Sequence, residues 1–177
     1  MRLFIAILFP EEITQYIQGV QEELRAQSKQ GNFIEMSNMH LTVIFLGEME
    51  ATRLNHVKEA MRKITVPSFS VLIQDIQSFK TQEGRLYYLS VKKNDQLETI
   101  VEELNDALSK FGFDISDREY KPHITLAREV LLLDDSISLK SELVQPKRMD
   151  VEKISLMRSD RIDGKVVYKE IASKHLP

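Results

Sequence analysis

The sequence predicts an α+β fold in which residues 1–177 form a single domain of two pseudo-symmetric lobes. Two observations support this prediction. Strand-like and helix-like hydrophobic patterns alternate along the chain, and the whole series occurs twice, with corresponding segments about 83 residues apart. No linker, low-complexity stretch or block of charge separates the two copies. We therefore expect antiparallel sheets flanked by helices, a pseudo-twofold axis and a central cleft.

The first copy opens with a β-prone apolar segment, RLFIAILF at 2–9, which the second copy matches with RLYYLSVK at 85–92. Each of these two strands is followed by a helical pattern. The other predicted elements are helices at 10–27 and 94–111, strands at 39–48 and 122–131, a helix at 51–64 with a shorter counterpart near 134–144, and strands at 69–79 and 150–160. Turns containing Gly84 and Gly164 then lead into a further strand.

The helix expected at 94–111 has the clearest end signals. Its apolar residues recur at helical spacing: Leu97, Ile100, Val101, Leu104 and Leu108. Asp95 is a plausible N-terminal cap, and Gly112 is a plausible stop at the C-terminal end.

The composition restricts the function. The absence of cysteine excludes disulfides and thiolate metal sites, and it fits a reducing, cytoplasmic location. A net charge of -3 argues against broad electrostatic binding of nucleic acid, so phosphate binding should be confined to a cleft. Pro10 and the two following glutamates interrupt the apolar N-terminus, and no segment has the length of a membrane span. We expect a monomer with no cofactor, no protein partner and no membrane association.

A His-x-Thr motif occurs at equivalent positions of the two copies, as HLTV at 40–43 and HITL at 123–126. Because residues i and i+2 of a strand share a face, His40 and Thr42 should project together, as should His123 and Thr125. The pseudo-symmetry would bring both pairs to the same cleft. Two isolated core histidines are the alternative interpretation, but of the four histidines in the chain it is this repeat-related pair that precedes threonine.

Two imidazoles at one site suit phosphodiester cleavage without a metal. A neutral histidine can take a proton from water while a protonated one gives a proton to the leaving ribose oxygen. The threonine hydroxyls can donate to the non-bridging phosphate oxygens. A zinc site is the alternative, but it usually needs a third protein ligand, and no acidic residue recurs beside both motifs. We therefore expect no metal.

Arg128 and Phe45 are candidate substrate-binding residues that occupy equivalent places after the two motifs. The planar guanidinium of Arg128 suits phosphate, although a regular strand would turn it to the opposite face from His123, so a bend is required. A solvated surface arginine is the alternative. Phe45 could stack on a base, or it could belong to the core. The remaining histidines, His56 in a helix and His175 in the C-terminal tail, are interpreted as structural.

These residues resemble the two-histidine phosphoesterase superfamily, and more closely the RNA 2',3'-cyclic phosphodiesterase family, also called the 2'-5' RNA ligase family. The similar blocks are RLFIAILFPEE, HLTVIFLGE, HITLAR and the duplicated lobes. The resemblance implies a hydrolase that opens RNA 2',3'-cyclic phosphates to 2'-phosphomonoesters, and in some relatives the joining of 2'-5' linkages. It also implies that His40 is the proton donor, that His123 is the acceptor, and that Thr42, Thr125 and Arg128 contact phosphate.

Two other functions remain open at this point. The same four motif residues would serve another small cyclic or 2'-5' linked nucleotide, because the motif does not read the base. A non-catalytic module that recognises RNA ends is a further alternative. It would have no use for two proton-transfer groups, which favours an enzyme.

Overall fold

The computed structural model describes residues 1–134 and 145–177, so the helix predicted near 134–144 falls almost entirely outside the described residues. The regular elements, apart from single 3-10 turns at Met36–Asn38 and Ala51–Arg53, are β1 (Arg2–Ile7), α1 (Glu11–Ala26), β2 (Ser28–Phe33), β3 (Leu41–Glu48), α2 (Leu54–Arg62), β4 (Phe69–Thr81), β5 (Gly84–Val91), α3 (Asp95–Lys110), β6 (His123–Leu132), β7 (Lys147–Val151), β8 (Lys153–Ile162) and β9 (Lys165–His175).

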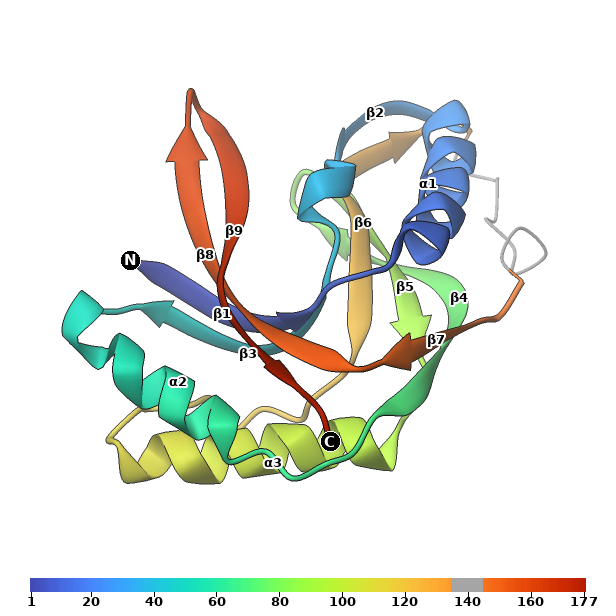
Figure 1. Cartoon of the computed structure of the whole chain (residues 1–177). Helices are drawn as coiled ribbons and strands as arrows, with labels where there is room; N and C mark the ends of the chain where they lie inside the picture. Colours follow the sequence, from blue (N-terminus) through green and yellow to red (C-terminus); the bar gives the residue numbers. More distant parts are fainter. Residues whose placement is uncertain (135–144) are drawn as a thin grey trace.

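The strands form two antiparallel sheets, which confirms the predicted α+β class. One sheet has four strands in the order β3-β1-β8-β9, and the other has five in the order β2-β6-β5-β4-β7. In Figure 1 the four-stranded sheet lies on the left, with α2 and α3 beneath it, and the five-stranded sheet lies on the right beside α1. The β8–β9 hairpin extends beyond the body of its sheet.

The two sequence copies do not form one lobe each, and that part of the prediction is wrong. The three strands β3-β1-β8 correspond by repeat position to β6-β5-β4, so the sheets do share a pattern. However, β4 comes from the first copy and pairs with β5 of the second, whereas β8 comes from the second copy and pairs with β1 of the first. Each copy therefore gives its third strand to the other copy's sheet.

Two further strand predictions are corrected. The segment predicted as one strand at 150–160 contains two, β7 in the five-stranded sheet and β8 in the four-stranded sheet, because the chain changes sheets at Glu152. Strand β2 was not predicted. Its sequence, SKQGNF, is polar and low in β propensity, and pairing with the edge of β6 determines its conformation.

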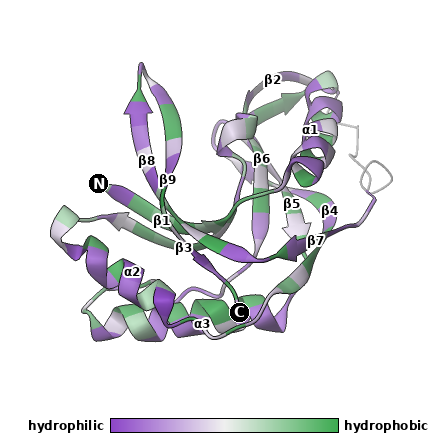
Figure 2. Ribbon diagram, viewed as in Figure 1, coloured by the Kyte–Doolittle hydropathy of each residue, from purple (hydrophilic) through white to green (hydrophobic). Residues whose placement is uncertain are grey.

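The helices bury one apolar face each, and Figure 2 shows hydrophobic and hydrophilic residues alternating along α2 and α3. The α3 cap is Asn94 rather than Asp95, because the Asn94 side chain accepts the Leu97 amide at 2.9 Å. Gly112 has φ +74 after the helix end, as its predicted role requires. Within the described residues, no helix is long and apolar enough to cross a membrane.

A buried glutamine joins α1 to the strand that carries the second motif. Gln21 is 5% exposed, and its Nε2 donates to the carbonyls of Ile34 at 2.7 Å and Leu126 at 3.0 Å. Gln21→Ala should destabilise the protein by about 1–3 kcal/mol, because the Ile34 carbonyl loses the Gln21 donor and the Leu126 carbonyl keeps only the Ile34 amide. Gln18→Ala, at an exposed position of the same helix, should stay within about 0.5 kcal/mol in urea unfolding. Equal effects of the two variants would contradict this role.

Candidate active site

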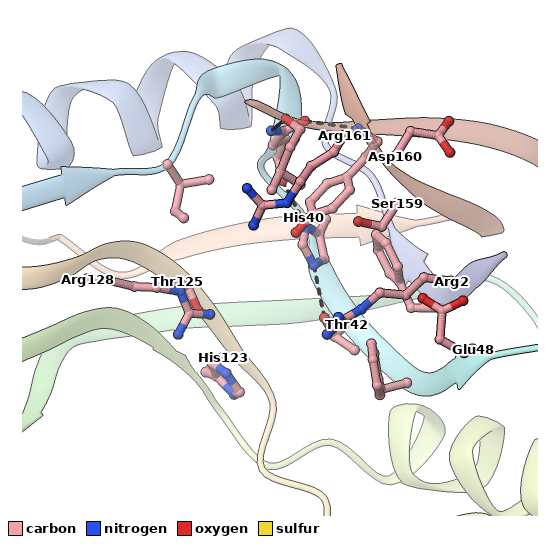
Figure 3. A pocket seen from close by; sticks show the side chains of 16 residues that line it. Arg2, His40, Thr42, Glu48, His123, Thr125, Arg128, Ser159, Asp160 and Arg161 are labelled. Carbon is pink, nitrogen blue, oxygen red and sulfur yellow. Dashed lines mark hydrogen bonds between the residues drawn. The ribbon is translucent and has the colours of Figure 1, made fainter. Parts of the chain in front are cut away.

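A cleft of about 610 Å³ is lined by residues from both sheets. All six residues predicted for the site line it: His40 directly before β3, Thr42 and Phe45 from β3, and His123, Thr125 and Arg128 from β6. Figure 3 shows the side chains of the two motifs on facing ribbons, with Arg128 beyond Thr125. The structure therefore brings together residues from two distant segments, whose chemical roles are still predictions.

A β-bulge in β6 explains how Arg128 reaches the cleft. The consecutive residues Tyr87 and Tyr88 of β5 pair with Ala127 and Thr125, so one residue of β6 has no partner on β5. This extra residue reverses the order in which successive side chains of β6 point to the two faces of the sheet. Arg128 therefore lines the cleft, although it lies an odd number of positions, three, after Thr125. The structure thus contains the bend that the position of Arg128 in the sequence required.

An equivalent bulge in β3 turns Phe45 to the cleft. Here the consecutive residues Ile5 and Ala6 of β1 pair with Ile44 and Thr42, which again leaves one residue of the motif strand unpaired. Phe45 is 54% exposed and lines the cleft instead of packing in the core. The duplicated sequence therefore produces a duplicated irregularity, at the same distance from each histidine.

His40 is held by hydrogen bonds at both ring nitrogens. Its Nδ1 is 2.8 Å from the carbonyl of Asn38, and because a carbonyl only accepts, Nδ1 carries a proton and donates it. In the neutral ring, Nε2 is then unprotonated and accepts the Thr42 hydroxyl at 3.0 Å. The backbone thus selects the tautomer that directs the reactive nitrogen toward its own threonine.

His123 has the same anchor on the opposite wall. Its Nδ1 donates to the carbonyl of Lys121 at 2.8 Å, and Lys121 precedes His123 by two residues as Asn38 precedes His40. The His123 ring is exposed, and it meets the edge of the Tyr88 ring at a centroid distance of 5.6 Å. The two histidines therefore share a tautomer but differ in their access to water.

The half-buried position of His40 lowers its pKa. Burial is the main cause, since Phe4 and Tyr168 lie with ring centroids 4.9 Å and 5.2 Å from the imidazole. The Asn38 carbonyl acts in the opposite direction and raises the pKa, while the nearby charge of His123 lowers it further. Neutral His40 is consequently favoured in the ligand-free cleft.

Removing the Tyr168 ring should move the pKa of His40 upward, toward the ordinary histidine value of about 6.5. Tyr168→Ala would admit water to the imidazole, and water stabilises the protonated form. The shift can be followed by NMR titration of the imidazole carbon-bound protons. Val167→Ala, at the neighbouring exposed position of β9, should leave the titration unchanged. An unchanged or lower pKa in Tyr168→Ala would contradict burial as the main cause.

Arg128 is exposed in the cleft, where it can bind an anion. Arg2 lies over the Phe45 ring at 5.0 Å, and the cleft carboxylate of Asp160 is paired with Arg158 at 2.9 Å. Arg161 also lines the cleft. The chain as a whole is acidic, so this local excess of arginine is where an anionic group would be attracted.

Sequence reasoning missed the residues that hold the two motifs in place. Tyr168 comes from β9, far from either motif, and nothing in its local sequence marks it. The Tyr120 hydroxyl donates to the carbonyl of Thr42 at 2.7 Å, and burial raises the pKa of Tyr120. This bond links the loop before the second motif to the strand of the first. Asn38 and Lys121 act through main-chain carbonyls, which leave no side-chain signal.

The two other histidines lie away from the cleft. His56 is exposed on α2 and stacks on Phe111 at 4.6 Å. His175 is also exposed, but it ends strand β9 and does not belong to an irregular tail. In the part of the chain that the structure describes, no group of three or more His, Cys, Asp or Glu side chains is arranged to hold a metal ion.

Comparison with known proteins gives a consistent result. The family model of the 2'-5' RNA ligase superfamily matches residues 9–163. The RNA 2',3'-cyclic phosphodiesterase of Thermotoga maritima is 34% identical over 131 residues, which cover 72% of this chain and 70% of that protein. The protein of the same name from Methanocaldococcus jannaschii is 29% identical over 177 residues, which cover 97% and 98% of the two chains.

Solved structures share the fold at lower identity. The crystal structure of E. coli LigT complexed with 3'-AMP has a TM-score of 0.81 at 23% identity, over 99% of this chain and 97% of that one. The protein TT0787 of Thermus thermophilus also has a TM-score of 0.81, at 22% identity, over 99% and 98% of the chains. With the family match over most of its length, the chain belongs to the 2'-5' RNA ligase superfamily, as a relative of the RNA 2',3'-cyclic phosphodiesterases.

Proposed function

We propose that this protein hydrolyses RNA 2',3'-cyclic phosphate ends to 2'-phosphomonoesters, with His40 and His123 as an acid–base pair. The observation that carries the proposal is the matched anchoring of the two imidazoles in one cleft, where each Nδ1 donates to a backbone carbonyl. That anchoring leaves Nε2 of each ring as the nitrogen that gains or loses a proton. The names of the relatives support the same reaction class.

In the proposed step, water attacks the cyclic phosphorus while the bond from phosphorus to the ribose O3' breaks. Neutral His123 takes a proton from the water, and protonated His40 gives a proton to O3'. The products are a 2'-phosphate and a free 3'-hydroxyl, and both histidines end in the opposite protonation state. The next cycle begins when the rings exchange protons with solvent. No metal takes part in this scheme.

The other cleft residues would bind the substrate. Thr42 and Thr125 would donate their hydroxyl protons to the non-bridging oxygens, whose negative charge grows as water adds. In the ligand-free cleft the Thr42 hydroxyl is bonded to His40, so substrate would replace that contact. Arg128 would pair with the same phosphate from β6. The exposed ring of Phe45 would stack on the terminal base.

The donor role of His40 requires substrate to reverse its lowered pKa. A bound phosphate anion would do this, because a negative charge near Nε2 favours imidazolium. His123→Ala should then retain a low activity limited by His40 alone, falling as pH rises because the donor loses its proton. If the residual activity instead falls as pH decreases, His40 is the base and the two roles are reversed.

The function is tested by hydrolysis of a nucleoside 2',3'-cyclic phosphate in EDTA between pH 5 and 9. We expect a bell-shaped profile, as an acid and a base of similar pKa require, with the 2'-phosphate as sole product. Activity that EDTA abolishes would refute the metal-free scheme. Binding of RNA ends with no turnover would favour a recognition module, and turnover of only other cyclic or 2'-5' linked nucleotides would change the substrate.

A further inference from the structure

An aromatic pair continues from His123 across the outer surface of the five-stranded sheet. Tyr88 on β5 meets the His123 ring at 5.6 Å, and Phe79 on β4 lies 6.2 Å beyond Tyr88, with the two rings inclined at 50°. Phe79 is 51% exposed, although it lies within a regular strand pair. Three rings from three adjacent strands therefore lead outward from the phosphate side of the cleft.

The positions of these rings are fixed by the sheet. Gln77 is the cross-strand partner of Tyr88, and its Oε1 accepts the Tyr88 hydroxyl at 3.0 Å. Phe79 pairs with Leu86, which is only 7% exposed. Cross-strand partners share a face of the sheet, so Phe79 and Leu86 lie on the same side as Tyr88, and the Phe79 ring still presents a large apolar area to water at a cost in free energy. A ligand base stacked on Phe79 would cover this exposed area.

We propose that Tyr88 and Phe79 form a binding subsite for the RNA strand on the 5' side of the cyclic end, with the base of the penultimate nucleotide stacked on Phe79. This inference rests on the proposed function, because the cyclic phosphate must lie between the histidines for the strand to leave past Tyr88. A second hollow of about 410 Å³ adjoins His123 and Tyr88, at the inner end of this path, and Phe79 lies outside it.

Stacking is the mode of recognition that fits this surface. Every base has a π face, so aromatic side chains bind single strands with little sequence preference. The chain carries a net charge of -3, and affinity for the strand outside the cleft therefore cannot come from a broad basic surface. The consequence is a preference for oligonucleotides with a cyclic end over free cyclic mononucleotides, with weak dependence on salt.

The test compares two substrates that share a terminal nucleoside, a nucleoside 2',3'-cyclic phosphate and a trinucleotide with the same cyclic end. For the trinucleotide, Phe79→Ala should lower kcat/KM by about tenfold, the effect of losing one base–aromatic stack. For the mononucleotide it should change kcat/KM by less than about twofold. Phe79→Tyr should retain the preference and Phe79→Leu should lose it, because leucine is apolar but offers no ring.

Ile162→Ala is the matched control, since Ile162 is 54% exposed at the end of β8 and does not line the cleft. It should affect neither substrate. A second readout is the fluorescence of 2-aminopurine placed at the penultimate position of a trinucleotide 2'-phosphate, which stacking on Phe79 would quench. The subsite is refuted if Phe79→Ala slows both substrates equally or neither. If the wild-type protein hydrolyses neither substrate, the proposed function itself fails.

Discussion

Replacing either His40 or His123 with alanine should lower kcat/KM for a 2',3'-cyclic phosphate by about 10²–10⁴-fold. Each variant removes one proton transfer, and a positioned acid or base contributes a factor of that order. The double variant should have a kcat/KM only slightly below that of the less active single variant. The two groups act in the same step, so the losses in activation free energy do not add. Steady-state rates at the pH optimum of the wild-type protein, with product identity checked by chromatography, measure the effect.

His56→Ala and His175→Ala are the controls, and both should stay within a few-fold of wild type. Both rings are exposed and outside the cleft. Since His40 is half-buried, its variant also needs a thermal unfolding curve, so that loss of fold is not mistaken for loss of chemistry. A folded His40→Ala protein with near wild-type turnover would overturn the two-histidine mechanism, and a hundredfold loss in His56→Ala would show that the site is elsewhere.

The placement of both His-x-Thr motifs in one cleft could be predicted from the sequence because a short-range rule was enough. Two residues of separation on a strand put His and Thr on one face, and the 83-residue repeat put the two pairs in equivalent places. Arg128 was harder, because its orientation depends on one unpaired residue in β6. A bulge is a property of two paired strands, and neither strand alone reveals it.

The exchange of strands between copies was not predicted, although part of its signal was present. The short turn before Gly84 makes β4 and β5 a hairpin, and hairpin strands pair with each other. Because β4 closes the first copy and β5 opens the second, that pairing already crosses the boundary between copies. The repeat predicts a single domain in which each copy forms one lobe, and the local turn argues against that assignment of strands to lobes. The polar strand β2 had no such signal, since only its neighbour β6 specifies it.

Arg128→Ala should reduce kcat/KM by about 10- to 100-fold, since a hydrogen bond to a charged partner contributes about 1.5–3 kcal/mol. The loss should appear in both KM and kcat, because the phosphate carries charge in the ground state and more in the transition state. Arg128→Lys should recover part of the activity, as lysine restores the charge but not the planar pair of donors.

Arg118→Ala, at an exposed position of the loop that leads to β6, removes the same charge away from the cleft and should leave the rate near wild type. Comparing the two arginine variants separates contact with phosphate from a change in net charge. If both lower the rate equally, and added salt removes the difference from wild type, Arg128 acts only through long-range attraction. A salt-independent loss confined to Arg128 would instead mean that the bulge in β6 has a function, because it turns this guanidinium to the same side as His123.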